Sequence, residues 1–332
     1  MRTLEELEDR LARPSAALVA DMAELDGDIM ILGAGGKLGP SLVRLALNAG
    51  KKVTAVSRFS EPGLADSLTG LGANVVSADV ADDEALRALP DAANVVFLVG
   101  AKFGTSGRQS AAWFTNTYLP GRVAERFRDS RIAALSTGNV YPLVPVASGG
   151  ATEDTPVGPV GDYAMSCLGR ERVMSHFSEQ YGTPLALIRL NYAVELRYGV
   201  LVDLAQKVNT GTPIDLSTGQ VNVVWQGYAN EVTLRALRHA SAPPYVLNLT
   251  GPELLSVRQL ATDLGRALGR EPVFSGQEAP TALLSNAARC HRTYGYPELT
   301  PAELIEHVAR WVAEGGRLLG KPTKFERRDG QF

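Results

Sequence analysis

The chain has 332 residues, 45% of them hydrophobic, enough to bury the core of one large domain or of two smaller ones. A formal net charge of -3 and a pI near 5.9 argue against a nucleic-acid partner. No run of about 18 apolar residues could cross a membrane, and the N-terminus lacks the apolar core of a signal peptide. The two cysteines show neither metal-ligand nor disulfide spacing. We therefore expect a soluble cytoplasmic protein without a metal site.

Residues 1–27 precede the first predicted strand. Their leucines recur at helical spacing, and the pattern breaks near Pro14. We expect a helical extension here, either a cap on the core or an oligomer contact.

A glycine-rich turn directly follows that strand, residues 29–32, and leads into residues 40–48, which have apolar residues at helical spacing. A buried strand, a glycine turn and a helix place a pyrophosphate at the helix N-terminus. The glycines let the backbone approach the phosphates, and the first-turn N–H groups point at the anion. The turn predicts a dinucleotide site, although an ordinary tight turn has the same pattern. The predicted contact residues are Gly33, Gly35, Gly36, Lys37, Leu38 and Gly39.

Strand and helix patterns alternate from there up to residue 190. The further predicted strands are residues 52–57, 73–79, 94–99, 131–136 and 184–190. This alternation predicts the α/β class, with a doubly wound parallel sheet of Rossmann type over residues 28–190. Ligands of such a sheet bind at the carboxyl ends of its strands.

The alternation loosens from residue 191, which predicts a smaller substrate-binding subdomain and a tail over residues 191–332. We expect residues 246–250 to form a strand that returns to the sheet. Helices are predicted at residues 256–268 and 301–319. The polar and basic residues 321–328 predict a solvated extension.

The end of the second strand indicates which dinucleotide is bound. An acidic residue there would accept hydrogen bonds from the ribose of NAD, but this strand ends in Ser57 and Arg58. A guanidinium suits a 2′-phosphate, so the sequence favours NADP, with NAD as the alternative. An arginine lying along the surface would give the same pattern. Asp79 and Val80, after the third strand, are placed to meet the adenine, or form a plain surface loop.

Several motifs together resemble the extended short-chain dehydrogenase/reductases, also called the NAD-dependent epimerase/dehydratase family. The likeness runs from about residue 28 to residue 312. Besides the glycine turn and Asp79, residues 135–141 are similar to the family's strand-end motif of hydroxyl residues leading to Val-Tyr. Residues 153–163 resemble the loop into its catalytic helix, and residues 189–191 resemble its Arg-x-x-Asn step within one residue.

The resemblance implies site residues beyond the glycine turn. Val99 and Gly100 end the fourth strand, on the nicotinamide side of such a sheet, and Asn116 matches an asparagine of the family's fourth helix. These three and Tyr163 are expected to contact the cofactor. The helices that hold Asn116 and Tyr163 are expected to pack in a homodimer interface.

The family's chemistry rests on Ser or Thr, Tyr and Lys. Thr137 matches the hydroxyl residue and Tyr163 the tyrosine of the Tyr-x-x-x-Lys pair, but Cys167 stands where the lysine belongs. The resemblance implies that Tyr163 is the general acid/base, assisted by Thr137, while hydride moves to or from the nicotinamide. Lys102 is predicted to replace the missing cation; a solvated loop lysine is the other interpretation. Cys167 is expected to be a buried small side chain, and Arg170 to form a surface ion pair.

Two functions remain open at this point. The first is an NAD(P)-dependent oxidoreductase or epimerase that acts on a hydroxyl or carbonyl of a sugar-like or sugar-acid substrate. A nucleotide-sugar is less favoured, because Arg197 and Lys207 are the only basic residues between positions 191 and 219. The alternative is a non-catalytic redox sensor that binds the dinucleotide. The missing lysine favours the sensor, and the retained Thr137 and Tyr163 favour the enzyme.

Overall fold

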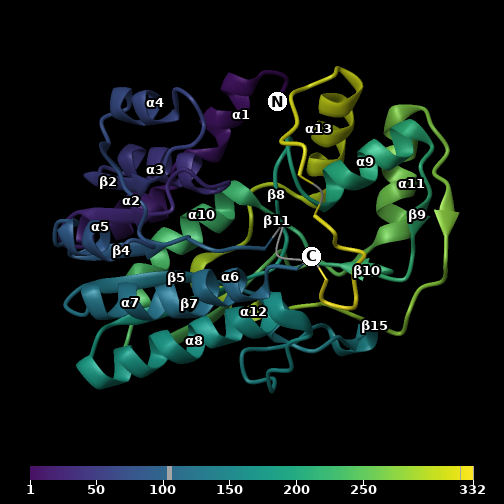
Figure 1. Cartoon of the computed structure of the whole chain (residues 1–332). Coiled ribbons are helices and arrows are strands. Elements are labelled where there is room, and N and C mark those ends of the chain that lie inside the picture. Colours follow the sequence, from purple (N-terminus) through teal and green to yellow (C-terminus); the bar gives the residue numbers. More distant parts are fainter. Residues whose placement is uncertain (103–106, 322, 332) are drawn as a thin grey trace.

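The computed structural model describes residues 1–102, 107–321 and 323–331. Its centre is a parallel sheet of seven strands in the order β12-β7-β5-β4-β1-β2-β3, flanked by helices (Figure 1). This confirms the predicted fold class. The strands are β1 (Ile29–Leu32), β2 (Val53–Ser57), β3 (Asn74–Ser77), β4 (Asn94–Phe97), β5 (Arg131–Thr137), β7 (Leu185–Leu190) and β12 (Tyr245–Leu249).

The chain winds outward from β1 in both directions. Ile29 pairs with Val53 of β2 on one side and with Asn94 of β4 on the other. The loops after β1 and β4 therefore leave the sheet in opposite directions. Ligands of open α/β sheets bind in the crevice at such a switch point.

Helices cover both faces of the sheet, with α3 and α10 on one side and α7 and α8 on the other (Figure 1). The helices are α1 (Leu4–Leu11), α2 (Ala16–Glu24), α3 (Gly39–Asn48), α4 (Leu64–Gly70), α5 (Asp83–Ala88), α6 (Gln109–Trp113), α7 (Leu119–Arg126), α8 (Gly161–Tyr181), α9 (Val200–Thr210), α10 (Gln226–Arg235), α11 (Val257–Leu268), α12 (Ala288–Tyr294) and α13 (Pro301–Ala313). No helix of the described part is both long and apolar enough to cross a bilayer.

Smaller elements complete the fold. A π-helical turn, η1 (Phe114–Tyr118), joins α6 to α7, and the remaining strands form two-stranded pairs outside the main sheet. These strands are β6 (Val144–Pro145), β8 (Ala193–Val194), β9 (Ile214–Asp215), β10 (Gln220–Val221), β11 (Val224–Trp225), β13 (Leu255–Ser256), β14 (Phe274–Ser275) and β15 (Thr281–Ala282).

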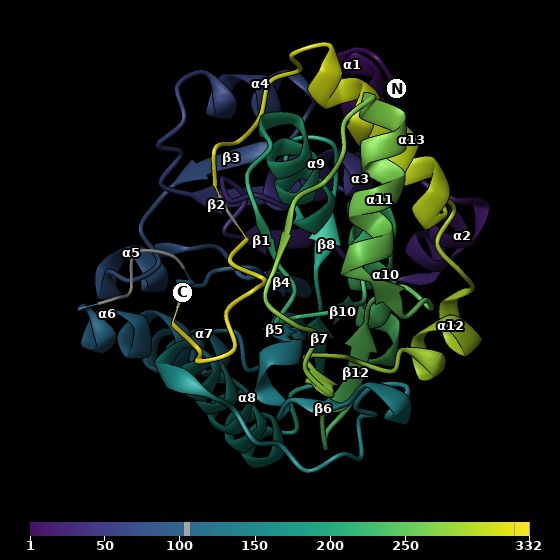
Figure 2. The same cartoon turned by 90° about the vertical axis from the view of Figure 1, so that its right-hand side faces the viewer.

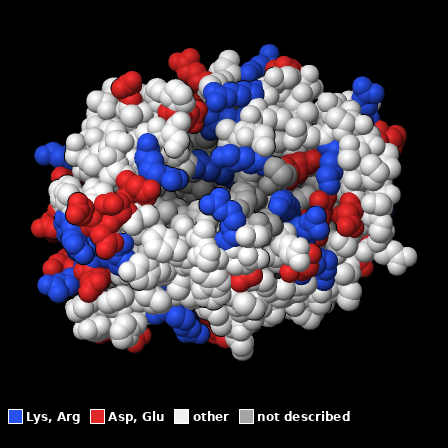
Figure 3. Space-filling model, viewed as in Figure 1, with Lys and Arg blue, Asp and Glu red and all other residues white. Residues whose placement is uncertain are grey.

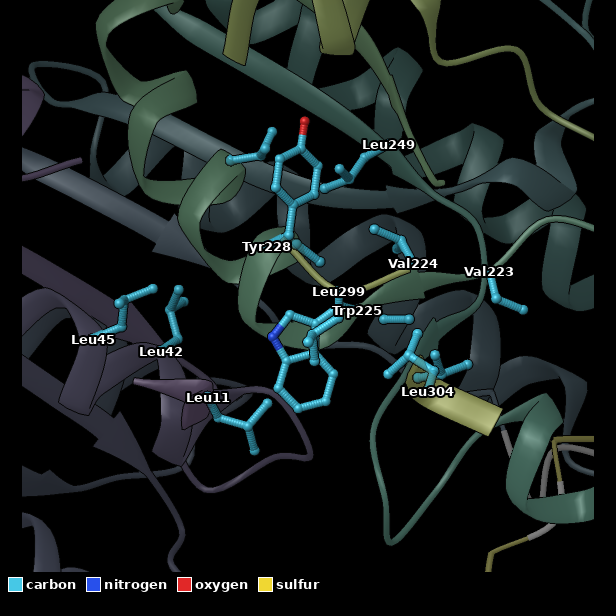
Figure 4. Packing of buried hydrophobic residues seen from close by; sticks show 14 of the residues in the cluster. Leu11, Leu42, Leu45, Val223, Val224, Trp225, Tyr228, Leu249, Leu299 and Leu304 are labelled. Atoms are coloured by element: carbon cyan, nitrogen blue, oxygen red, sulfur yellow. The ribbon is translucent and has the colours of Figure 1, made fainter. Parts of the chain in front are cut away.

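The core consists of clusters on both faces of the sheet. Ile29 and Ile31 of β1 point into the larger cluster, and Met30 and Leu32 point into the other, as the alternation along a strand requires. Both faces are covered, so β1 is a continuous apolar run. Trp225 lies fully buried in the larger cluster, among side chains of α1, α3 and α13 (Figure 4).

The N-terminal helices belong to this core. Leu7, Leu11, Leu18 and Met22 are buried inside the chain. Both helices pack on α10, and α1 also packs on α3. Of the two interpretations that the sequence left open, the structure shows the cap.

The C-terminal half contributes one strand to the sheet and a helical group beside it. β12 pairs with β7 in parallel, and α9, α11 and α13 pack together (Figure 2). The prediction that the last helix reaches residue 319 is wrong, because α13 ends at Ala313. The chain turns at Gly315 with φ of +70°, and the indole of Trp311 donates to the carbonyl of Arg317 at 3.1 Å.

The predicted solvated extension at residues 321–328 is also wrong. Thr323 and Phe325 are both buried. The backbone N–H of Thr323 and its hydroxyl both donate to the carboxylate of Asp203 on α9, at 2.8 and 2.6 Å. Arg328 donates to the carbonyl of Thr281 at 2.7 Å. The polar tail is ordered because a half-buried carboxylate needs donors and Phe325 supplies an apolar anchor.

Candidate active site

In the glycine turn after β1, backbone segments a few residues apart approach each other closely. Gly33 has φ of +92°, and the N–H of Gly36 donates to its carbonyl at 2.9 Å. A Cβ on Gly39 would lie 2.2 Å from the carbonyl oxygen of Ala34, so this position accepts only glycine. The N-terminus of α3 receives no side-chain cap within the described residues. The N–H groups and positive dipole end of this helix therefore fit a dinucleotide pyrophosphate.

The tips of β2 and β3 lie beside this turn. A Cβ on Gly35 would lie 2.7 Å from the hydroxyl of Ser57, so a larger residue here would have to displace that side chain. Arg58 is 72% exposed, and its guanidinium lies 3.7 Å from the carboxylate of Asp79. Val80 points into the core, so only its backbone faces the ligand side. The guanidinium is thus exposed at this edge of the sheet, with the Asp79 carboxylate as its ion-pair partner.

The loop after β4 is held by Asn116 of η1. The amide of Asn116 accepts from the N–H of Ala101 and donates to its carbonyl, each at 2.8 Å, and also donates to Ser166 at 3.0 Å. Its hydrogen-bonding groups are all engaged, so its side chain fixes this loop and has no donor left for a ligand. Val99 packs next to Gly33, and Gly100 lies against Asn116.

The structure brings the three predicted catalytic residues together. Thr137 ends β5, Tyr163 lies in the first turn of α8, and Lys102 lies in the loop after β4. All three line one cavity of about 210 Å³ at the carboxyl ends of the strands. The ammonium of Lys102 lies 5.7 Å from the centroid of the Tyr163 ring. The hydroxyl of Thr137 accepts from the N–H of Asn139 at 3.2 Å, which fixes its position.

The surroundings of Tyr163 oppose its ionisation. Burial raises its pKa well above the usual value, and a thiolate at Cys167 would raise it further. The charge of Arg170 and a hydrogen bond with Thr137 lower it. Burial also lowers the pKa of Lys102 to about 8, so this lysine still carries its charge at pH 7.

The position of the missing lysine is apolar, as expected. Cys167 is buried, and burial raises the pKa of its thiol. The expected surface ion pair of Arg170 is wrong, since this arginine is only 5% exposed. It donates to the carbonyl of Leu135 at 2.5 Å and to the side chain of Asn116 at 3.2 Å. Helix periodicity places it on the face of α8 that also carries Cys167, directed at β5.

A buried ion pair holds α8 to the sheet below the cavity. Arg189 of β7 makes a two-pronged contact with Glu171 of α8, at 2.7 and 3.0 Å. Ser136 donates to the same carboxylate at 2.5 Å, and Arg189 also donates to Tyr141 at 2.7 Å. Such a satisfied network fixes the helix that presents Tyr163. The position of Arg189 in the family motif was one signal of this network in the sequence.

The side chain of Lys37 is the main feature that sequence reasoning missed. The sequence placed Lys37 in the phosphate turn, but its ammonium reaches across the cleft to the carbonyl of Ala193 at 3.1 Å. It also lies 3.5 Å above the centroid of the Tyr198 ring. Burial lowers the pKa of Lys37 to about 7; Glu195 raises it, and the charge of Lys102 lowers it further. Lys37 and Tyr198 line the same cavity as Tyr163.

Asn191 and Thr323 also line this cavity. Asn191 is 2% exposed, and its amide nitrogen has no hydrogen-bond partner among the described residues. Its place in the Arg-Leu-Asn motif could have drawn attention to it. No signal in the sequence could have placed Thr323 here, because that placement depends on how the tail docks.

Comparisons with known proteins agree with this architecture. Residues 29–197 match the model of the NAD dependent epimerase/dehydratase family. A search of curated proteins found no match.

Solved structures of this architecture are similar over most of the chain. UDP-glucose 4-epimerase from Thermotoga maritima, solved with UDP-glucose, has a TM-score of 0.72 at 15% identity, covering 87% of this chain and 99% of that one. UDP-glucuronic acid 4-epimerase from Bacillus cereus, in complex with NAD, has a TM-score of 0.71 at 17% identity, covering 86% and 99%. A short-chain dehydrogenase/reductase superfamily protein from Agrobacterium tumefaciens with bound NAD has a TM-score of 0.71 at 18% identity, covering 86% and 97%. At these identities the likeness shows the fold.

Proposed function

This chain belongs to the NAD-dependent epimerase/dehydratase family of enzymes, and from this premise we propose that it is an NAD(P)-dependent oxidoreductase or epimerase. Its substrate is a sugar-like molecule or sugar acid that reacts at a hydroxyl or carbonyl. The observation that carries the proposal is that Tyr163, Thr137 and Lys102 line one cavity. The rival, a redox sensor, has only the substitution at Cys167 in its favour.

The dinucleotide would be held by the glycine turn and the N-terminus of α3. When bound, it supplies the acceptor or donor of the hydride. Arg58 supports NADP, because an exposed guanidinium at the tip of β2 suits a 2′-phosphate. Asp79 nearby is compatible with NAD, which remains the alternative and is the cofactor named for the Bacillus cereus structure.

In the proposed mechanism, the substrate oxygen sits between the hydroxyls of Tyr163 and Thr137. During oxidation the substrate hydroxyl gives its proton to Tyr163, and Thr137 donates a hydrogen bond to the developing negative charge. An unperturbed tyrosine with a pKa near 10 is ionised in only about one part in a thousand at pH 7. A cation must therefore favour the phenolate, and Lys102 is the candidate for this role because its ammonium lies near the ring.

The substitution Tyr163→Phe tests this mechanism. It removes the proton acceptor and leaves the glycine turn untouched, so turnover should fall by about 10²- to 10⁴-fold while dinucleotide affinity stays the same. Turnover of a panel of neutral sugars and sugar acids with NADP and NAD is the measurement. Tyr181→Phe, at an exposed tyrosine at the end of α8, is the matched control. Equal turnover in Tyr163→Phe and the wild type would sink the proposal.

The substitution Arg58→Ala tests the cofactor preference. Loss of a charged hydrogen bond to the 2′-phosphate should weaken NADP binding about tenfold or more, with NAD binding unchanged. Isothermal titration calorimetry measures both affinities, and Arg87→Ala, at an exposed arginine of α5, is the control. A wild type that binds NAD tenfold more tightly than NADP would contradict the preference.

We further propose that the enzyme is a homodimer. Trp113, Phe114 and Tyr118 are exposed large apolar side chains on α6 and η1. Together with Val173 and Phe177 of α8 they line a groove of about 580 Å³. Contiguous apolar surface of this kind supports an interface, and its helices are the ones that the family resemblance assigned to one.

A further inference from the structure

The side chain of Lys37 is directed away from the turn that its backbone helps to form. Its ammonium donates to the carbonyl of Ala193 and lies over the ring of Tyr198, both in the segment that follows β7. An ammonium has three donors, and the carbonyl takes only one of them. Lys37 therefore has donors left, and it lines the same cavity as Tyr163 and Thr137.

The acidic residues near Lys37 are already engaged. Glu195 pairs with Arg197 at 3.1 Å, and Asp203 accepts two hydrogen bonds from Thr323. Within the described ranges Lys37 makes no ion pair shorter than 4 Å. A half-buried cation with only neutral partners is costly unless a ligand of opposite charge completes the site.

The wall of the cavity presents donors. Lys37 and Lys102 both line it, and none of its described lining residues is a carboxylate. The buried amide nitrogen of Asn191, which lacks a partner in the described chain, lies in the same wall. Buried donors in folded proteins nearly always have a hydrogen-bond acceptor, which a bound ligand would supply here. Two ammonium groups and an open amide donor together suit an anion.

The surface agrees with this picture. Figure 3 shows Lys and Arg side chains around a hollow in the middle of the face that is seen in Figure 1, although the net charge of the chain is -3. Burial and the charge of Lys102 lower the pKa of Lys37. A bound anion would offset both effects.

We propose that this cavity binds the anionic group of an acidic substrate, and that Lys37, with Asn191 beside it, is the residue that selects for the acid. The inference rests on the proposed function and narrows its substrate class to small hydroxy acids of monosaccharide size. The cavity, about 210 Å³ in volume, is below the range of about 300–1,000 Å³ that is typical of pockets for drug-sized ligands. The anion is a carboxylate of the substrate; a phosphate of the dinucleotide shares its chemistry, and the experiment separates the two.

The test compares matched acid and neutral sugars. Calorimetry on the protein saturated with NADPH, which cannot oxidise a hydroxyl, gives the affinities for D-glucuronate against D-glucose and D-galacturonate against D-galactose. We expect the wild type to bind at least one acid about tenfold or more tightly than its neutral partner, the effect of one charged hydrogen bond. Lys37→Met should abolish this ratio, and Lys37→Arg should keep most of it. Lys52→Met, at an exposed lysine outside the cavity, is the matched control.

A second readout follows protons. Acid binding near pH 8 should be accompanied by proton uptake, seen as a heat that depends on the ionisation enthalpy of the buffer, because the anion raises the pKa of Lys37 from about 7. The uptake should be smaller in Lys37→Met, where only Lys102, with a pKa of about 8, is left in the cavity wall to gain a proton.

The outcomes are separable. A wild type with no acid preference, or one that binds neither sugar of a pair, overturns the inference. So does a Lys37→Met protein that loses NADPH affinity but keeps the acid preference, since the anion is then a phosphate of the dinucleotide. An acid preference that depends on Lys37 without turnover of any sugar leaves this inference standing and removes the proposed function. Turnover that depends on Tyr163 without an acid preference leaves the proposed function standing and overturns this inference.

Discussion

Arg170 places a permanent charge on the helix face from which the family's lysine is missing. Tyr163, Cys167 and Arg170 lie on one face of α8, and the thiol between the other two is kept neutral by burial. The guanidinium is fixed by Leu135 and Asn116, and within the described residues no carboxylate pairs with it. The charge of this arginine lowers the pKa of Tyr163. Lys102, by contrast, loses its charge as the pH rises through about 8.

Replacing this arginine should change the pH dependence of the reaction. Arg170→Leu removes a charge that lowers the pKa of Tyr163, so that pKa rises and the phenolate forms only at higher pH. The rise of kcat/KM with pH should shift to higher pH, measured on whichever substrate the panel identifies. Arg170→Lys keeps the charge and serves as the control. Cys167→Lys should shift the same limb to lower pH; an unchanged profile in both Arg170→Leu and Cys167→Lys would show that neither position acts on Tyr163.

At the scale of elements, the sequence predicted those strands, helices and turns whose structure is determined by their own residues. β1 could be predicted from its apolar run because both sheet faces are covered. The glycine turn could be predicted because a Cβ on Gly39 would collide with the carbonyl of Ala34, five residues earlier in the same turn. The pairs β8 with β11 and β10 with β13 are two residues long and exist only through tertiary contacts. Thr137 and Tyr163 could be placed from the sequence because they lie at the end of a predicted strand and at the start of a predicted helix. The reach of Lys37 to Ala193 could not, since it depends on how the chain folds back after β7.

The apolar face of α6, η1 and α8 gives a test of the homodimer. Tyr118 is 56% exposed, and Tyr118→Asp places a charge where a partner's apolar side chains would pack. Sedimentation velocity at micromolar concentration should show a dimer for the wild type and a monomer for this variant. Tyr296→Asp changes a tyrosine that is more exposed and lies outside this face, and should leave the dimer intact. A wild type that sediments as a monomer would contradict the homodimer and leave the fold untouched.

At the scale of the whole molecule, the cavity is assembled from segments far apart in the chain. Lys37 comes from the first turn after β1, Thr137 from the end of β5, Asn191 from the end of β7 and Thr323 from the tail. The sheet fixes the first three through its strand ends, and the last arrives only when the tail docks on α9. The sheet therefore carries the residues of the proposed chemistry, and the C-terminal tail adds Thr323 to the wall of the cavity.

The hydrogen bonds between Thr323 and Asp203 couple ligand binding in the cavity to docking of the tail. Thr323 is part of the wall, so a ligand that touches the wall favours the attached tail, and an attached tail favours the ligand by the same factor. The affinity for a ligand of this cavity thus depends on the contact between Asp203 and Thr323, which lie more than a hundred residues apart in the chain.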